Sequence, residues 1–584
     1  MRYISSRDES VYYSDNEAVL KNFTPEGGVF VPEEFPVFTD RDWERLTKGS
    51  LEKKLTFVIS KFLPSLPIDK LEDAFKKVLM RSKVQLDVKL TALNEYSPYP
   101  YSFELWHGPG ASFYDIIANI SPVIYSFAHE RSAERIGKKL LFLVSSLPET
   151  TKSWVEGLSA TEAEFIVFAA SENNKQRNNR GRRRKKKQRL SSLDLDNFEN
   201  IDLIGSEKLR ASLLDINLEL DDLENNIELN NFLDEKSYVI QVIKDYSWPV
   251  LLAEIAYFCI LSAELRALEN YESDELVDIV IPSSNLSNIL AALYAKSLGA
   301  NFGEIILAAN KNNLLVDLLR NGKYNVRRRS YNTNSPDLDL LGSENLQRLL
   351  FEFAERDSNK LCKWMDELAE SGQFNVDSRT LKNMQTLMLA GFSDDANTRQ
   401  AIVAVYTEYD HMVDPHTATG FAVYERYRKN VNPEPRRVVF LSLFSPYVFP
   451  VAVAEALLDN LEKYNYIDQL RLDLFKETDL IIPVRYELAN IYAELANIEA
   501  ESKKNENKFY GEKVFINTAH EEQKPEEDEA EKEFLLRRQQ NAESNLEKLK
   551  SEYSTINFKN EEVRTAKDII SIVENKVGKS TDED

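Results

Sequence analysis

The stretch ELVDIVIPSSNLSNILAALYAKSLGANFGEIILAAN, residues 275–310, decides the fold class. It begins with an apolar run of strand length, and a loop of Ser and Asn follows. Apolar residues then recur with helical spacing up to Gly299, a residue type that commonly follows a helix end. A second apolar run, residues 302–309, predicts another strand. This order indicates a parallel α/β unit, in which a loop and a helix N-terminus can hold a phosphate.

The same alternation occurs elsewhere in the chain. KKLLFLVSS (138–146) and AEFIVFAAS (163–171) are continuous apolar runs of strand length. WPVLLAEIAYFCILSAEL (248–265) has helical length and is apolar on most sides, so we expect it to be buried. Apolar strands that alternate with helices are typical of parallel sheets covered on both faces. We therefore expect an α/β fold with two Rossmann-like open sheets.

Composition narrows the function classes. The formal charge of -23 disfavours general attraction to nucleic acid or to anionic membranes. Cys259 and Cys362 lie in apolar helical contexts, which favours core packing in a reducing compartment, and no metal site is expected from these two and five scattered histidines. The first residues contain no apolar signal segment, and no uncharged apolar run reaches about 18 residues. We expect no membrane contact and a cytoplasmic location.

Changes in composition predict three regions. Residues 1–90 combine a Gly/Pro turn with helical patterns, and residues 91–457 carry the α/β pattern. The basic run ENNKQRNNRGRRRKKKQR, residues 172–189, has no apolar periodicity and is interpreted as a disordered insertion. Residues 458–584 form a helical and acidic extension, in which a short heptad pattern over 535–556 is too brief to establish a coiled coil.

Five segments, in chain order, together resemble threonine synthase, a fold-type II enzyme that depends on pyridoxal phosphate. The resemblance covers about residues 1–457 and leaves the C-terminal extension without a counterpart. The five segments are TPEGGVFVPEEFP (24–36, with the preceding MRYISSRDE), FELWHGPGASFYDI (103–116), residues 275–310 with the KNN that follows them, SPDLDLLGSENLQRLLFEFAE (335–355) and DPHTATGFAVYERY (414–427).

The resemblance implies a lysine that holds the cofactor as a Schiff base, and the chain departs from the family here. In the family, HGP is followed by Thr, two apolar residues, Phe, Lys and Asp. In this chain Tyr114 occupies the lysine position, between Phe113 and Asp115. A phenol cannot form an imine with an aldehyde, so no catalytic residue is retained at this position.

Other matched cofactor and substrate elements also depart from the family. The family's Gly-Asn-Phe-Gly-Asn phosphate loop corresponds to a degenerate loop without glycine, for which capping of the helix over 286–298 is the simplest interpretation. The Ser-Gly-Asp-Thr-Gly loop corresponds to LPETTKSWVEG (147–157), and Thr-Ala-His-Pro-Ala-Lys-Phe corresponds to residues 443–449. Leu286, Leu443 and Phe444 are expected to fill the cofactor volume, and His107 and His416 to make structural hydrogen bonds. The degenerate loop contains Ser283, Ser284, Asn285, Ser287 and Asn288.

Packing and turn residues are kept while the polar groups that meet cofactor and substrate are lost. The first hypothesis is therefore a threonine-synthase-like pseudoenzyme that binds no cofactor and serves as a scaffold, with a protein partner on the C-terminal extension. The second is an active threonine synthase, converting O-phospho-L-homoserine to L-threonine and phosphate through another lysine. The third is a weak RNA or protein contact through Lys175–Arg189. The resemblance makes a homo-oligomer possible without deciding the oligomeric state.

Overall fold

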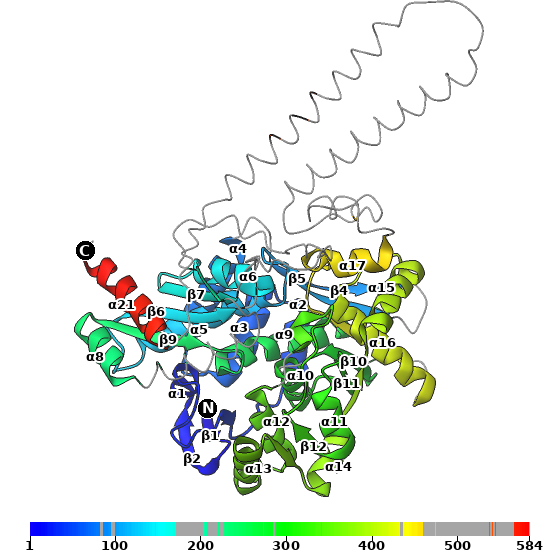
Figure 1. Cartoon of the computed structure of the whole chain (residues 1–584), viewed down its shortest axis with the longest axis horizontal. Coiled ribbons are helices and arrows are strands. Elements are labelled where there is room, and N and C mark those ends of the chain that lie inside the picture. Colours follow the sequence, from blue (N-terminus) through cyan, green and yellow to red (C-terminus); the bar gives the residue numbers. More distant parts are fainter. Residues whose placement is uncertain are drawn as a thin grey trace, which may run out of the picture.

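The computed structural model describes most of the chain up to residue 458 and one helix near its C-terminus (Figure 1). The basic run 172–189 and the heptad pattern over 535–556 lie outside these residues, apart from three isolated positions in the latter. The described residues are 1–81, 86–94, 100–146, 148–170, 203–206, 226–272, 274–283, 286–339, 342–431, 436–458 and 566–582, with residues 220, 223, 474, 537, 540 and 544.

The N-terminal part combines a small antiparallel sheet with helices. Its strand order is β2-β1-β3, and Ser14 and Glu17 form a capping box that starts α1. Tyr3 and Phe30, from two strands of this sheet, are fully buried in the main core. The elements are β1 (Arg2–Ser5), β2 (Asp8–Ser14), α1 (Asp15–Leu20), β3 (Phe30–Pro32), α2 (Asp40–Lys48), α3 (Leu51–Phe62) and α4 (Ile68–Arg81).

The larger sheet has six strands in the order β14-β11-β10-β15-β5-β4. All neighbouring pairs are parallel except β4 and β5, which are antiparallel. The strands β10 and β11 are the two apolar runs of the stretch 275–310. The bounds are β14 (Met388–Phe392), β11 (Phe302–Ala309), β10 (Val277–Pro282), β15 (Val438–Ser442), β5 (Pro100–His107) and β4 (Asp87–Ala92).

Apolar side chains cover both faces of this sheet. Along β10, Ile279 and Ile281 belong to the main core, whereas Val280 between them belongs to a second core on the opposite face. The helices α9 (Trp248–Arg266) and α10 (Ser287–Ser297) pack in the main core. The opposite face is covered by α15 (Asp395–Tyr409), α16 (Pro415–Asn430) and α17 (Pro450–Leu457), at the right in Figure 1.

The smaller sheet is parallel throughout, with the order β8-β7-β6-β9. Along β6, Phe142 and Val144 face the main core with α5 and α6, whereas Leu141 and Leu143 face a third core on the outer side. The elements are α5 (Tyr114–Glu130), β6 (Lys139–Ser146), α6 (Pro148–Leu158), β7 (Glu164–Ala170), β8 (Leu203–Ser206), α8 (Ile227–Glu235) and β9 (Tyr238–Ile243).

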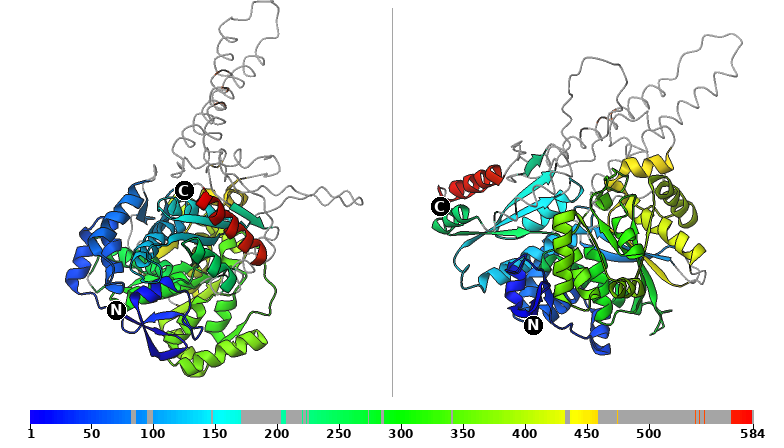
Figure 2. Two further views of the ribbon diagram at one scale, coloured as in Figure 1. Left: turned by 90° about the vertical axis from the view of Figure 1, so that its left-hand side faces the viewer. Right: turned by 60° about the horizontal axis from the view of Figure 1, so that its bottom comes forward.

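The outer core of the smaller sheet is completed by a helix from the far end of the chain. Helix α21 (Ala566–Asp582) contributes Ile569, Val573 and Val577, which are fully buried with apolar residues of β6, β7, β9 and α8. Figure 2 shows α21, in red, in front of the fold in the left view and at the upper left edge in the right view. The end of the C-terminal extension therefore folds against its own protein.

Helices and short elements at the base of Figure 1 follow β11 in the chain. The strands β12 and β13 form an antiparallel pair, and helix α13 ends at Gly372 in the left-handed conformation. The elements are α11 (Leu314–Asn321), β12 (Lys323–Asn325), η1 (Pro336–Asp339), α12 (Asn345–Phe353), α13 (Ser358–Ser371), β13 (Gln373–Asn375) and α14 (Ser378–Leu387); η2 (Pro446–Val448) follows β15.

The α/β class and the two open sheets confirm the sequence prediction, and the larger sheet adds one antiparallel edge strand, β4. The boundaries at residues 90 and 457 stay predictions. Among the described residues, α9 alone is long and apolar enough to cross a bilayer, and 94% of its most apolar window is buried inside the protein. Cys259 on α9 is buried, Cys362 on α13 is half-buried, and neither forms a disulfide. The described residues contain no cluster suited to a metal ion.

Candidate functional site

Two loops that follow neighbouring strands meet at the carboxyl edge of the larger sheet. After β5, Ser112 forms an isolated bridge with Phe444, which follows β15. The Phe113 amide donates a hydrogen bond to the carbonyl of Leu443 at 2.8 Å. In open α/β sheets this edge is the usual place for a ligand. The two segments that carry the resemblance to the lysine region and to the pyridine-facing region therefore lie together.

The HGP turn is held by Asp115, in the first turn of α5. Its carboxylate accepts hydrogen bonds from the Gly110 amide at 2.9 and 3.1 Å and from the Ser112 amide at 3.3 Å. Burial raises the pKa of Asp115 to about 6, although these hydrogen bonds act in the opposite direction. A Cβ atom at Gly110 would lie 2.0 Å from Ser153 Oγ, so glycine is required there. The retained residues thus fix the turn.

Tyr114 is the first residue of α5, and its side chain is buried beside the turn. Its hydroxyl donates a hydrogen bond to Asp245 Oδ1 at 3.3 Å, across to the loop that follows β9. The ring contacts Phe113 and Trp154, with centroid separations of 4.3 and 6.1 Å. Burial raises the pKa of Tyr114 well above its ordinary value, and neighbouring carboxylates raise it further. The phenol is therefore neutral and acts as a hydrogen-bond donor.

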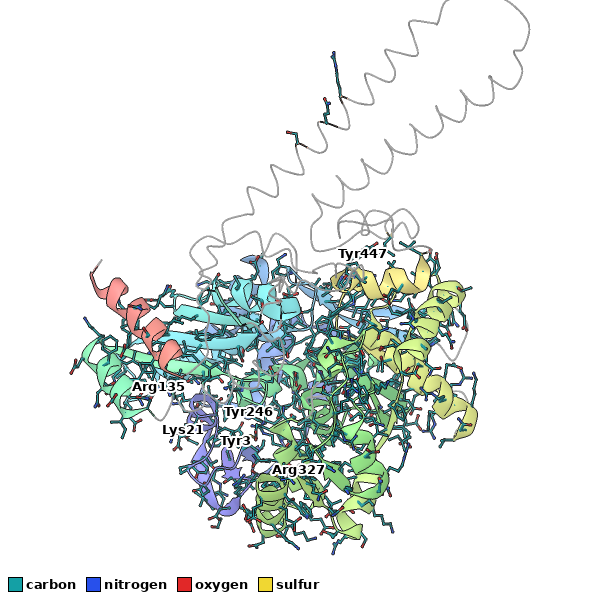
Figure 3. All side chains as sticks on the ribbon, viewed as in Figure 1. Tyr3, Lys21, Arg135, Tyr246, Arg327 and Tyr447 are labelled. Carbon is teal, nitrogen blue, oxygen red and sulfur yellow. The ribbon has the colours of Figure 1, made fainter. Side chains whose placement is uncertain are left out.

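Three carboxylates act on this phenol. Asp245 follows β9 and directly precedes Tyr246, which Figure 3 labels; Glu254 lies on α9 and Asp337 on η1. Glu254 is fully buried, and burial together with the charges of Asp245 and Asp337 raises its pKa well above the ordinary value. Burial also raises the pKa of Asp245, against the effects of Tyr114 and the adjacent Lys244. Three acidic side chains are thus gathered around Tyr114, and two of them, Asp245 and Glu254, hold their protons more tightly than a free carboxyl group does.

The predicted degenerate phosphate loop lies between β10 and α10. Ser284 and Asn285 are outside the described residues. Ser287 Oγ donates to Glu254 Oε1 at 2.9 Å, and Asn288 Oδ1 accepts a hydrogen bond from the Tyr257 hydroxyl. Both side chains therefore bind residues of α9.

The capping expected for α10 is wrong in detail. The helix begins at Ser287, and its N-cap residue is Leu286, whose side chain cannot cap it. Leu286 has φ of 64°, in the left-handed region that disfavours residues with a Cβ atom, and its side chain is fully buried. The burial of this apolar side chain outweighs backbone strain of about 1–2 kcal/mol. Packing, and not side-chain capping, therefore holds the start of α10.

Aromatic packing occupies the region that follows β15. Leu443 and Phe444 are fully buried, as expected, and the Phe444 ring contacts Phe113 and Phe449 at 5.7 and 5.2 Å. His416 lies 4.8 Å from the same ring. Leu443 and Phe444, which have no hydrogen-bonding side-chain groups, thus follow β15 where the resemblance implies a polar contact to a pyridine nitrogen.

The two histidines of the matched segments make structural hydrogen bonds, as expected. His416 is fully buried; its Nδ1 lies 2.7 Å from Asp414 Oδ1, and its Nε2 accepts a hydrogen bond from the Asp337 amide at 3.2 Å. Nε2 is therefore unprotonated and Nδ1 carries the proton. His107 Nε2 lies 2.5 Å from Glu104 Oε2.

Comparisons with known proteins agree with the fold and with the N-terminal segment. The family model "Threonine synthase N terminus" matches residues 2–78. The threonine synthase of Pseudomonas aeruginosa is 23% identical over 503 residues, which are 84% of this chain and 97% of that protein. The comparisons agree in pointing to the threonine synthase family. Threonine synthase-like 1 of Homo sapiens is 24% identical over 463 residues, or 76% of this chain.

This chain covers 58% of human threonine synthase-like 1, so it spans little more than half the length of that relative. The threonine synthase structure from yeast superposes with a TM-score of 0.67 at 21% identity, covering 80% of this chain and 94% of the yeast chain. A pyridoxal-phosphate-bound threonine synthase from Brucella melitensis gives 0.66 at 23% identity, covering 78% and 91%. These likenesses establish the fold.

The described residues of the cleft do not fit the family's cofactor. Pyridoxal phosphate needs an amine for its aldehyde and donors for its phosphate. Tyr114 offers a phenol, and Ser287 already donates to Glu254. The acidic side chains of Asp245, Glu254 and Asp337 lie around Tyr114, and Glu254 takes the Ser287 hydrogen bond. The covalent chemistry at position 114 and the hydrogen bonding of Ser287 therefore both oppose the cofactor.

Sequence reasoning did not find the acidic side chains of the cleft. Glu254 had a visible signal, because a carboxylate within the apolar helix 248–265 must be buried with a partner or a function. Asp245 and Asp337 had none, since each follows or interrupts a loop where acidic residues are ordinary. Their convergence depends on tertiary packing that joins β9, α9 and η1.

Proposed function

We propose that this chain is a pseudoenzyme of the threonine synthase family: a scaffold that binds other molecules and performs no pyridoxal phosphate chemistry. One observation carries the proposal. At the position of the cofactor lysine, the Tyr114 hydroxyl is hydrogen-bonded to Asp245 and surrounded by carboxylates. A phenol in this setting offers neither an imine nor a positive charge, and catalytic groups that act together are lost together.

The test uses purified full-length protein with pyridoxal phosphate, and Pseudomonas aeruginosa threonine synthase as the positive control. We expect no internal-aldimine absorbance, no borohydride-fixed adduct and no phosphate release from O-phospho-L-homoserine. We also expect Tyr114→Lys to fold without gaining the aldimine absorbance, because its ammonium group would pair with Asp245. An aldimine in the unaltered protein would refute the proposal.

The alternative function, an active threonine synthase with a non-standard lysine, is favoured by two amines near the cleft. Lys244 is buried, and its charge lowers the pKa of Asp245; Lys152 on α6 acts in the same direction on Asp115. Peptide mapping after borohydride reduction distinguishes the functions, since the alternative requires a pyridoxyl group on one of these lysines. Lys244→Arg and Lys152→Arg then identify which amine carries it.

The partner-binding part of the proposal concerns the C-terminal extension. Complete removal of residues 460–584 would also remove α21, whose apolar side chains complete the outer core. A better variant replaces residues 460–560 with a flexible linker and retains α21. We expect this variant to fold but to capture less of the protein partner than the full chain does in a pulldown. If it captures the partner equally well, the partner contacts another part of the chain. The separate nucleic acid contact through Lys175–Arg189 is tested by deleting that run.

A further inference from the structure

Four polar side chains from four separate elements converge on the cleft. Tyr114 begins α5, Asp245 follows β9, Glu254 lies within α9 and Asp337 lies in η1. The Tyr114 hydroxyl binds Asp245, and the three carboxylates are close enough to raise the pKa of that phenol. Such a cluster inside a fold costs free energy unless hydrogen-bond donors or positive charge offset it.

Two buried oxygen atoms, one in this cluster and one at the end of β10, have no hydrogen-bond partner. One is Glu254 Oε2, whose companion Oε1 accepts from Ser287. The other is Ser283 Oγ, directly after β10. Ser283 continues the alternation of Ile279 and Ile281, which face the main core with α9 and α10, so it lies on the side of the sheet that carries Glu254. Both oxygens are more than nine-tenths buried.

The chemistry of these oxygens defines the ligand class. An ionised carboxylate oxygen only accepts hydrogen bonds, a hydroxyl can accept one, and a bound cation would favour the ionised form of a buried carboxyl group such as Glu254. The adjacent Lys244 offsets charge at Asp245, whereas the charges that act on Glu254 are both negative. We propose that the cleft binds a small ligand with an ammonium group, which donates hydrogen bonds to Glu254 Oε2 and Ser283 Oγ. This inference rests on the proposed absence of pyridoxal phosphate from the same cleft.

The surroundings limit the size of the ligand. Leu286 and Phe444 are fully buried at the cleft, so the group that enters is small. Asp245 is only half-buried, which leaves one side of the cluster open to solvent. No group of side chains in the described residues is arranged to hold a metal ion, so an N–H cation fits better than a bare divalent ion. The acidic side chains thus favour an ammonium group in the cleft in which the family binds a phosphate group.

The experiment is a calorimetric titration of full-length protein at pH 8 with methylammonium chloride. Sodium chloride at the same ionic strength controls for screening, and tetramethylammonium chloride supplies positive charge without an N–H donor. We expect saturable binding of methylammonium alone. Glu254→Gln should weaken that binding about tenfold or more, because it removes a charge-assisted hydrogen bond. Ser283→Ala should weaken it several-fold, and provides a second test if Glu254→Gln does not fold.

Glu235→Gln is the matched control, because Glu235 is an exposed carboxylate at the end of α8. It should bind methylammonium like the unaltered chain. Equal responses to methylammonium and sodium, or to tetramethylammonium, would overturn the inference, and so would unchanged binding in both Glu254→Gln and Ser283→Ala. An internal aldimine with pyridoxal phosphate would instead overturn the proposed function. Absence of both aldimine and ammonium binding removes the inference and leaves the proposed function standing.

Discussion

Ile569→Ala tests whether α21 is an integral part of the α/β core. The Ile569 side chain is fully buried in the outer core of the smaller sheet, with Val573 and Val577 on the same helix. Truncation of a buried isoleucine to alanine costs about 2–5 kcal/mol. Helix α21 is separated from the rest of the fold by a long stretch of sequence. The substitution should therefore weaken the docking of α21 before it destabilises the rest of the fold.

The magnitude follows from the docking equilibrium. A loss of about 2 kcal/mol shifts the population of undocked helix about 30-fold, and larger losses shift it further, since about 1.4 kcal/mol corresponds to a factor of ten. Amide hydrogen exchange with peptide resolution measures this directly. We expect faster exchange in α21 and in the facing strands β6 and β9, while β10 and β11 of the larger sheet keep their rates.

The matched control is Ser571→Ala, on the exposed side of the same helix. A surface substitution of this kind changes stability by less than about 0.5 kcal/mol. Ile569→Ala and Ser571→Ala should therefore differ clearly in the exchange of α21. Identical exchange in the two variants would refute the docking of α21 on the smaller sheet, and so would an effect of Ile569→Ala confined to the larger sheet.

Three further predictions concern the cleft. Leu286→Gly should be more stable than Leu286→Ala by about 1 kcal/mol in urea unfolding, because glycine tolerates the left-handed conformation; the reverse order would contradict the strain. Gly110→Ala should destabilise the protein by more than 1 kcal/mol, since its Cβ would meet Ser153 Oγ, whereas Gly342→Ala, in open space, should be neutral by the same measurement. Asp115 should make stability fall by about 3 kcal/mol between pH 4 and pH 6, because the unfolded chain ionises this group first; Asp115→Asn should flatten the urea midpoint profile over that range.

Much of the fold was predictable because local pattern and tertiary packing agree. The apolar runs of 275–310 became β10 and β11 with α10 between them, and the continuous apolar helix became the buried α9. Gly299 has φ of 104°, as expected for a residue after a helix end. Strands buried on both faces leave a strong signal in sequence, since nearly every position must be apolar.

The start of α10 and the docking surface of α21 could not be predicted from the sequence as well as the strands could. Serines and asparagines before a helix predict capping, but here Leu286 takes the cap position, with its side chain buried in the main core. The apolar spacing of α21 indicates an amphipathic helix without naming the surface that receives it. Both outcomes depend on contacts between distant segments, which a local pattern does not encode.

The acidic cleft bears on whether the chemistry of the family can return by a single change. A lysine at position 114 would restore an amine, yet the nearest groups would be Asp245 and Glu254, which would hold that amine as a charged ion pair. A protonated amine is not a nucleophile toward an aldehyde, and carboxylates raise the pKa of a neighbouring ammonium group. The side chains that replaced the cofactor contacts therefore oppose the lysine itself. Under the proposed function, a gain of catalysis would therefore require the carboxylates, the loop before α10 and the residue at 114 to change together.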